Sequence, residues 1–221
     1  IADHYTQIAS AIRGTIREKY WDTTRGLFAD TYDHRSFSQH VNSLAILAGI
    51  VTGEEATRVM ERTLNDSSLI QATIYFRYYV HQALKVASMG DHLLDNLQIW
   101  RDQMALGLTT WAEMPEPTRS DCHAWGASPN IEFYRILLGI DSDAPGFRKI
   151  RIAPSLGKLK EVSGTIPHPL GSVTAAYKLD ERGEGTARLV LPEGTTGIFI
   201  WDGKEIPLKP GEQVISLSSR H

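Results

Sequence analysis

The spacing of apolar residues changes at Gly146, and this change limits the fold more than any other feature of the chain. Before it, apolar residues recur every three or four positions, the spacing of an amphipathic helix, as in Ile1, Tyr5, Ile8, Ile12 and Ile16. After it, Val173, Ala175 and Tyr177 occupy every second position, which is typical of a half-buried strand. A helical part therefore precedes a β part.

Composition divides the chain at the same place. Residues 147–221 hold nine of the 18 glycines and six of the 10 prolines, although they make up only about a third of the length, and such enrichment is typical of turns between strands. Residues 1–146 carry 12 basic and 18 acidic side chains, a net charge of −6, against 11 and 8, or +3, in the rest. We predict a helical domain over residues 1–146 and a β-domain over residues 147–221.

The pattern predicts a mainly α fold followed by β. Six helices are expected, over residues 1–19, 41–51, 52–64, 70–86, 93–104 and 128–139. Apolar residues cover nearly every face of residues 41–51, which predicts a helix enclosed by others. Six antiparallel strands forming a small β-sandwich are expected over residues 149–153, 161–166, 172–178, 186–191, 197–201 and 213–217.

Charge and cysteine content argue against several classes of function. The net charge of −3 leaves no basic patch for nucleic acid or anionic membranes, and no apolar run is long enough for a membrane span. Cys122, the only cysteine, cannot form an internal disulfide, and it would point away from the adjacent His123. We therefore expect no metal site and no cofactor. The sequence indicates no cellular compartment.

The stretch from Gly107 to Ala127 separates two predicted helices and is too long for a simple connector. Pro115 and Pro117 favour extended chain before them, so Trp111 and Glu113, two positions apart, should face the same side. An indole stacks on the apolar face of a sugar while a carboxylate acts on a hydroxyl or a water, so this pair suits carbohydrate. In the alternative interpretation, Trp111 is a core residue and Glu113 caps a helix or forms a salt bridge.

A second polar and aromatic cluster follows within the same stretch. His123 and Trp125 are two positions apart, and extended chain would place them on one face. Tyr75, Tyr78 and Tyr79 are expected to pack with Phe76 between helices, although Tyr75 stands near the start of a predicted helix, from which its side chain could reach a pocket. These side chains extend the candidate carbohydrate site.

Several stretches of this chain match sequence motifs of one enzyme family. In the helical part they are Leu108–Glu113, Ser120–Ala127, Gly139–Ile140 and Ala144–Phe147. In the β part they are Ile150–Pro154 and Gly164–Gly171. In these motifs the chain resembles the C-terminal part of bacterial α-L-rhamnosidases of glycoside hydrolase family 78. The resemblance covers nearly the whole chain, and the motifs are specific in combination.

The resemblance implies the C-terminal half of an (α/α)6 toroid followed by a β-sandwich, and an inverting hydrolysis of terminal α-L-rhamnosyl groups. It assigns the general base to Glu113 and substrate binding to His123, with Trp125 beside it. Many members place a tryptophan directly before the base, whereas Ala112 stands there in this chain and the indole belongs to Trp111. The acidic stretch that supplies the family's general acid has no match here, so we expect the chain alone to be inactive.

Other functions stay open at this point. One is a non-catalytic carbohydrate-binding protein, in which Trp111 and Trp125 stack on sugar and Glu113 only hydrogen-bonds. Another is a different toroid glycosidase, or a lyase acting on uronic acids, for which Arg119 would be the cation beside the pocket. In each case the partner is a carbohydrate. A second copy of the chain could also cover apolar helix faces in a homo-oligomer.

Overall fold

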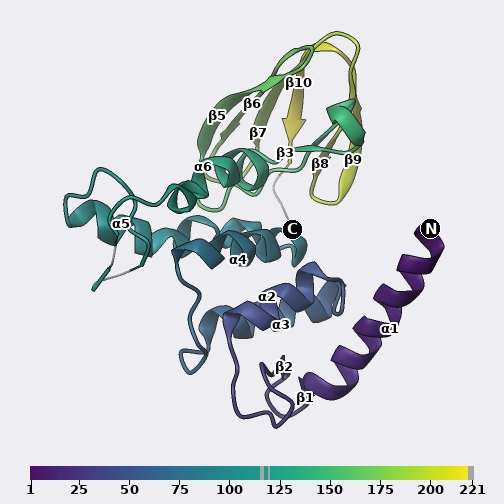
Figure 1. Ribbon diagram of the computed structural model, residues 1–221. Coiled ribbons are helices and arrows are strands. Elements are labelled where there is room, and N and C mark those ends of the chain that lie inside the picture. The colour runs from purple at the N-terminus through teal and green to yellow at the C-terminus, as the bar shows by residue number, and fades with distance from the viewer. Residues whose placement is uncertain (115–116, 119, 219–221) are drawn as a thin grey trace. The chain divides into compact units, whose positions relative to one another are not determined.

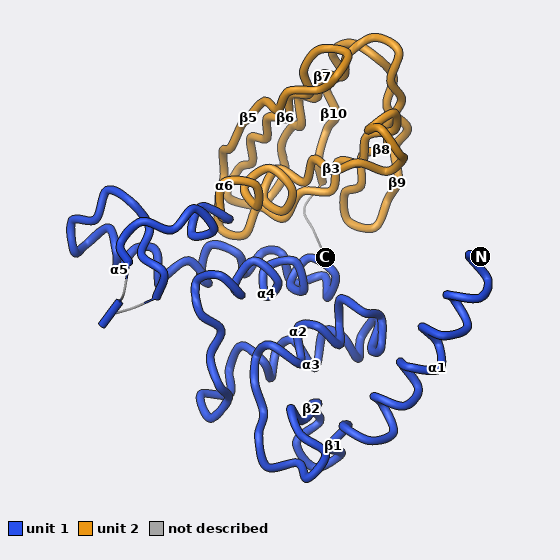
Figure 2. Tube along the Cα trace, viewed as in Figure 1, with its two compact units in different colours: residues 1–128 blue, residues 129–221 orange. Residues whose placement is uncertain are grey.

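The computed structural model describes residues 1–114, 117–118 and 120–218 (Figure 1). They form two compact units, Ile1–Ser128 and Pro129–His221 (Figure 2). Helices dominate the first unit and strands dominate the second. The units divide ahead of residue 146 because Leu138 packs in the core of the β-unit. A domain boundary after residue 146 stays a prediction.

All six predicted helices are present, with changes at their ends. The first unit holds α1 (Ala2–Tyr20), α2 (Gln39–Leu47), α3 (Gly53–Asn65), α4 (Ile74–Val86) and α5 (Gln98–Ala105). The second begins with α6 (Pro129–Glu132), which continues as a π-helical turn, η4 (Phe133–Leu137). The predicted helix over residues 93–104 starts late, because two 3₁₀ turns, η1 (Gly90–His92) and η2 (Leu94–Leu97), precede α5. Their arrangement as half of an (α/α)6 toroid stays a prediction.

A short hairpin between α1 and α2 was not predicted. Its strands, β1 (Trp21–Asp22) and β2 (Leu27–Phe28), have two residues each, which is too short for an alternating pattern to show in the sequence. Leu27 and Phe28 are buried in the core of the first unit. The hairpin thus contributes directly to that core.

The prediction that α2 is enclosed on nearly every face is wrong. Leu44 is 45% exposed, whereas Asn42 and Gln39 are buried. The amide of Asn42 accepts a hydrogen bond from the N–H of Phe28 (2.8 Å) and donates to the carbonyl oxygen of the same residue (3.1 Å). Buried backbone groups need partners, and this side chain supplies two that the short hairpin lacks.

Helix α1 presents its apolar stripe mostly to solvent. Ile1, Tyr5, Ile8 and Ile12 are exposed, and only Ile16 packs on the core of this unit. In the C-terminal half of α1, Tyr20 also packs on that core, and Arg17 forms an ion pair with Glu55 of α3 at 2.6 Å. The apolar stripe predicted from the sequence is therefore present on the helix, but most of its side chains are not buried in this chain.

The second unit contains two four-stranded sheets. One has the order β10-β7-β6-β5 and is antiparallel throughout, and the other has the order β3-β4-β8-β9. The strands are β3 (Ile140–Ser142), β4 (Lys149–Ile152), β5 (Glu161–His168), β6 (Gly171–Leu179), β7 (Gly185–Leu191), β8 (Thr196–Trp201), β9 (Lys204–Leu208) and β10 (Gly211–Leu217). Inward residues of both sheets share one apolar core, which includes Ile150, Phe199 and Tyr177.

The expectation of purely antiparallel strands is wrong for one pair. β4 and β8 run parallel, with Lys149 opposite Thr196. Three strands of the other sheet lie between them in the chain, and so long a crossover lets two neighbouring strands run in the same direction. β3 and β9 were also not predicted. β9 contains Pro207, but it lies at a sheet edge, where proline is tolerated.

Candidate functional site

The loop that the sequence singled out folds back on itself as two arms within the first unit. The N–H of Glu113 donates to the carbonyl oxygen of Ser120 (2.9 Å), and the N–H of His123 donates to that of Trp111 (2.8 Å). These pairings run antiparallel, although neither arm is a regular strand. They bring the two sequence clusters of the predicted site side by side. Pro115 and Arg119, which also entered the predictions, lie outside the described residues.

Two buried side chains of α5 fix the arms. Gln103 accepts a hydrogen bond from the N–H of Ala112 (3.0 Å), and the indole N–H of Trp100 donates to the carbonyl oxygen of Gly126 (2.7 Å). Both side chains are almost fully buried, so they give the loop fixed attachment points. Sequence reasoning missed them because nothing in a helical pattern identifies which loop a helix supports.

Glu113 and His123 face each other across the arms. Glu113 is only 9% exposed, and the distance from its Oε1 to Nε2 of His123 is 4.0 Å. Among the described residues, no partner hydrogen-bonds to Nδ1 of His123, although that atom is buried. A buried donor or acceptor without a partner is costly, so a water or a ligand hydroxyl would be held well there.

Aromatic rings continue the site from His123 outward. The His123 and Trp125 rings lie 4.5 Å apart between centroids, and Trp125 meets Tyr75 of α4 edge to face at 5.3 Å. Trp125 is 43% exposed and Tyr75 is 50% exposed, so both rings are accessible. His123 and Trp125 meet through a 3₁₀ turn, η3 (Ala124–Ala127), and not through the extended chain that was predicted.

Trp111 occupies the opposite arm and is half-buried. Gly126 packs directly against it, since a Cβ at position 126 would lie 2.4 Å from Cβ of Trp111. The backbone carbonyl of Trp111 accepts the hydrogen bond from the N–H of His123 described above. Trp111 is therefore placed to support the arms, and the structure brings all five predicted residues, Trp111, Glu113, His123, Trp125 and Tyr75, into one connected cluster.

The described residues contain no group of three or more His, Cys, Asp and Glu side chains placed to hold a metal ion. None of the helices in the described part of the chain is long and apolar enough to cross a membrane.

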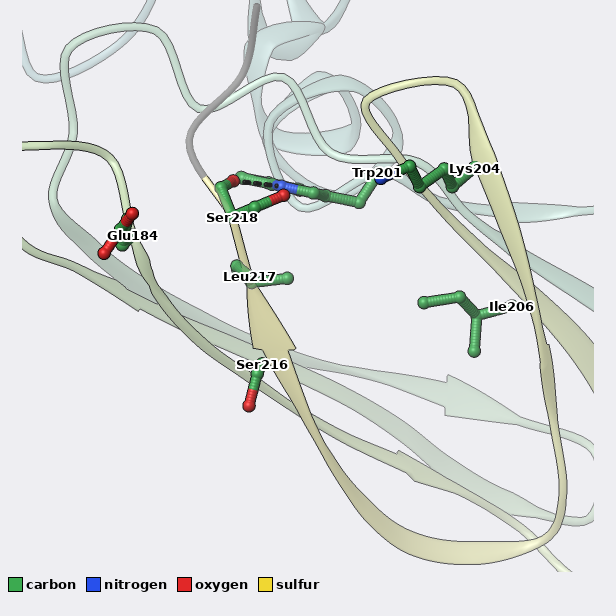
Figure 3. Close-up of a pocket in the computed structure, with 7 residues that line it drawn as sticks. All are labelled: Glu184, Trp201, Lys204, Ile206, Ser216, Leu217 and Ser218. Atoms are coloured by element: carbon green, nitrogen blue, oxygen red, sulfur yellow. Dashed lines mark hydrogen bonds between the residues drawn. The ribbon is translucent and has the colours of Figure 1, made fainter.

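A separate cavity of about 430 Å³ lies in the second unit, between the edge strands β9 and β10 (Figure 3). Ile206 and Leu217 supply apolar surface, and Lys204 and Glu184 add charges. Trp201 lines it too, but this ring is nearly buried and its N–H donates to the carbonyl oxygen of Ser218 (2.8 Å). None of the predicted site residues lies in this cavity.

Known proteins resemble this chain in sequence over the second unit and in structure over both units. Residues 139–211 match the family model of the bacterial alpha-L-rhamnosidase C-terminal domain. The resemblance to α-L-rhamnosidases is confirmed. The α-L-rhamnosidase match covers about a third of the chain, lies within the β-unit and does not include Glu113. No curated protein sequence matches the chain.

Solved α-L-rhamnosidase structures share the fold. A family 78 rhamnosidase of Bacillus sp. GL1 has 24% identity and a TM-score of 0.69 over 87% of this chain. The enzyme from Aspergillus terreus has 16% identity and a TM-score of 0.78 over 98% of it. Streptomyces avermitilis α-L-rhamnosidase in complex with L-rhamnose has 17% identity and a TM-score of 0.72 over 100%. The chain spans only 21%, 27% and 24% of these three proteins, respectively.

Proposed function

We propose that this chain supplies the general base and part of the sugar-binding surface of an inverting α-L-rhamnosidase. Glu113 takes a proton from a water molecule, and that water attacks the anomeric carbon of a terminal α-L-rhamnosyl group. The bond to the leaving oxygen breaks while a second carboxylic acid protonates that oxygen. His123, Trp125 and Tyr75 bind the sugar, and Trp111 lies beside them.

One observation carries this proposal: a largely buried carboxylate stands beside an imidazole with an unpartnered nitrogen, and accessible aromatic rings lead away from both. Glu113 lies 4.0 Å from His123, and the Trp125 ring packs on that histidine. A pyranose has an apolar face for the rings and hydroxyls for the imidazole and the carboxylate. The bound L-rhamnose in the Streptomyces avermitilis structure supports a rhamnosyl ligand.

The general acid is proposed to come from a part of the enzyme outside this chain. Inverting hydrolysis needs two carboxyl groups far enough apart to admit a water, and the sequence motif that resembles the family's base is present without the motif for the acid. We expect the 221-residue chain to bind L-rhamnose and to hydrolyse nothing by itself. The helical residues 1–146 would carry this site, and residues 147–221 would form the following β-domain.

Binding of L-rhamnose to the chain tests the proposal directly. We expect chemical-shift changes in the aromatic and histidine signals on titration with L-rhamnose, and none with D-glucose at the same concentrations. Trp125→Ala should weaken binding about three- to tenfold, the effect of removing one aromatic contact. Absence of binding by the wild-type chain, or equal binding of both sugars, would contradict the proposal.

A non-catalytic carbohydrate-binding protein is the second candidate, because the accessible rings of Trp125 and Tyr75 would serve it equally well. The two candidates differ in the role of Glu113. In the binding protein Glu113 only accepts a hydrogen bond, so its replacement by Gln would change affinity and no rate. Arg119, the cation required by a uronic acid lyase, is outside the described residues, so no observation favours that activity.

A further inference from the structure

The row of aromatic rings does not end at Tyr75. Along α4, Tyr79 follows Tyr75 by four positions, which places both on one face of the helix. Their ring centroids lie 6.4 Å apart, and Tyr78 meets Tyr79 at 5.2 Å. With Trp125 and His123, these tyrosines form a connected surface, which we call the aromatic row.

Three of the ring contacts in the row are edge to face, whereas His123 and Trp125 are tilted by 48°. The planes of Tyr75 and Trp125 are inclined by 66°, and those of Tyr75 and Tyr79 by 75°. An edge-to-face contact sets the rim of one ring on the face of the other, and Phe76 also packs against Tyr79 at 4.9 Å, so the exposed ring surface of the row lies on Tyr75 and Trp125 and in part on Tyr79. Tyr78 and Tyr79 are partly exposed and do not belong to the buried face of α4.

Hydroxyl groups line the same surface. The pKa of the Tyr79 phenol is raised by electrostatic repulsion from Tyr75 and by a hydrogen bond with it, so the Tyr79 hydroxyl lies close to that of Tyr75 and stays protonated at neutral pH. Neutral hydroxyls donate and accept hydrogen bonds. The Tyr75–Tyr79 end thus combines apolar faces with paired hydroxyls, as a sugar ring requires.

We propose that Tyr79, together with Tyr78, binds the second sugar ring of the substrate, the ring that leaves when the rhamnosyl bond is cleaved. This inference rests on the proposed function, because it takes Glu113 as the base. The base stands at one end of the row, and the row leads away from it through His123, Trp125 and Tyr75. In an inverting reaction the leaving group departs on the side opposite the attacking water, so the second ring belongs at the far end.

The proposal specifies a class of substrate. A rhamnosyl group attached to another sugar would contact Tyr79, whereas a rhamnosyl group on a small alcohol such as methanol would not reach it. The chain should therefore bind a rhamnosyl disaccharide about three- to tenfold more tightly than methyl α-L-rhamnoside, the gain expected from one additional stacked ring.

Calorimetric titration of the 221-residue chain with methyl α-L-rhamnoside and with α-L-rhamnosyl-(1→2)-L-rhamnose tests this inference. Tyr79→Ala should abolish the preference for the disaccharide, and Tyr79→Phe should keep most of it because the ring remains. Tyr32→Ala, on an exposed loop residue outside the aromatic row, is the control and should keep the preference in full. Circular dichroism of each variant separates a loss of binding from a loss of fold.

The outcomes separate the two proposals. Binding of both ligands with equal affinity by the wild-type chain, or an unchanged preference in a folded Tyr79→Ala variant, would overturn the second-ring site and leave the proposed function standing. If Tyr79→Ala does not fold, loss of the preference in Tyr79→Phe would count against stacking as its cause. Failure of the wild-type chain to bind either ligand would overturn the proposed function itself.

Discussion

Nε2 of His123 lies 4.0 Å from Oε1 of Glu113, so the histidine and the carboxylate are neighbours without a direct hydrogen bond. The backbone of each is held by the opposite arm of the loop, which fixes their separation. Catalytic hydrogen bonds are often long before a substrate binds and tighten in the complex. A sugar hydroxyl or a water that bridges the two would complete the arrangement.

Replacing the carboxylate of Glu113 tests its role as a base. In a full-length enzyme that contains this chain, Glu113→Gln should lower kcat about 10²- to 10⁴-fold, because an amide cannot accept the proton of the attacking water. Glu54→Gln, at an exposed carboxylate of α3, should leave kcat unchanged. Hydrolysis of an aryl α-L-rhamnoside gives the rates, and NMR gives the configuration of the product. Retention of configuration would contradict an inverting base.

The contact between Gly126 and Trp111 should be intolerant of even one methyl group. In Gly126→Ala the new Cβ would lie 2.4 Å from Cβ of Trp111, an atom close to the backbone that cannot swing aside. We expect a loss of about 1–3 kcal/mol in the free energy of unfolding and weaker rhamnose binding.

Gly14→Ala is the matched control for Gly126→Ala. Position 14 lies within α1 and has nothing within 4 Å of the new Cβ, so helix propensity should add about 0.5–1 kcal/mol of stability. Urea denaturation measures both variants. Equal effects of the two substitutions would mean that the close approach at Trp111 does not determine the result.

Asn42 should be the most costly polar side chain to truncate in the first unit. Asn42→Ala removes the hydrogen bonds to both backbone groups of Phe28 and leaves them buried, which should cost about 2–5 kcal/mol in the free energy of unfolding. Asn65→Ala, which removes one exposed hydrogen bond to Glu61, should change that free energy by less than about 0.5 kcal/mol. Similar urea midpoints for the two variants would refute this account.

His34 should stabilise the first unit in a pH-dependent way. Nε2 faces the carbonyl oxygen of Lys19 at 3.0 Å and Nδ1 faces the carboxylate of Asp22 at 3.2 Å, so both partners are acceptors and favour the doubly protonated ring. The Lys19 carbonyl and then Asp22 raise the pKa of His34. The N–H of Arg25, and also His34, lower the pKa of Asp22.

The signs of the two shifts define the pH window. A raised histidine pKa gives stability that is complete below the unfolded value of about 6.5 and is lost as pH rises through the folded pKa. A lowered aspartate pKa gives stability that is present above about 3.9 and is lost as pH falls through the folded pKa. The contact is therefore strongest in mildly acidic solution, between these limits.

His34→Asn isolates this effect, because His34 has a φ of +54° and asparagine tolerates that conformation. The wild-type protein should exceed this variant in Tm by more at pH 5.5 than at pH 8.5. Thermal denaturation at the two pH values provides the comparison. A difference in Tm that does not vary with pH would show that His34 acts only through its shape.

Local periodicity was sufficient to place the six helices and six of the strands, because 3.6- and 2-residue repeats are properties of neighbouring residues. The length of the connector and its paired polar and aromatic residues are also visible in the sequence, and they placed Glu113 and His123 in one loop. It did not identify β1 and β2, whose two-residue strands are shorter than any repeat.

Tertiary structure decided what periodicity cannot encode. It buries Asn42 and exposes Leu44. The buried backbone N–H and C=O of Phe28 require hydrogen-bond partners, and the side chain of Asn42 supplies them from the inner face of α2. It pairs β4 with β8 in parallel, since strand direction follows from a crossover and not from alternation. It also brings Tyr75 to Trp125 from a different helix. The sequence determines which segments are helices, strands and loops, whereas long-range packing determines which side chains meet.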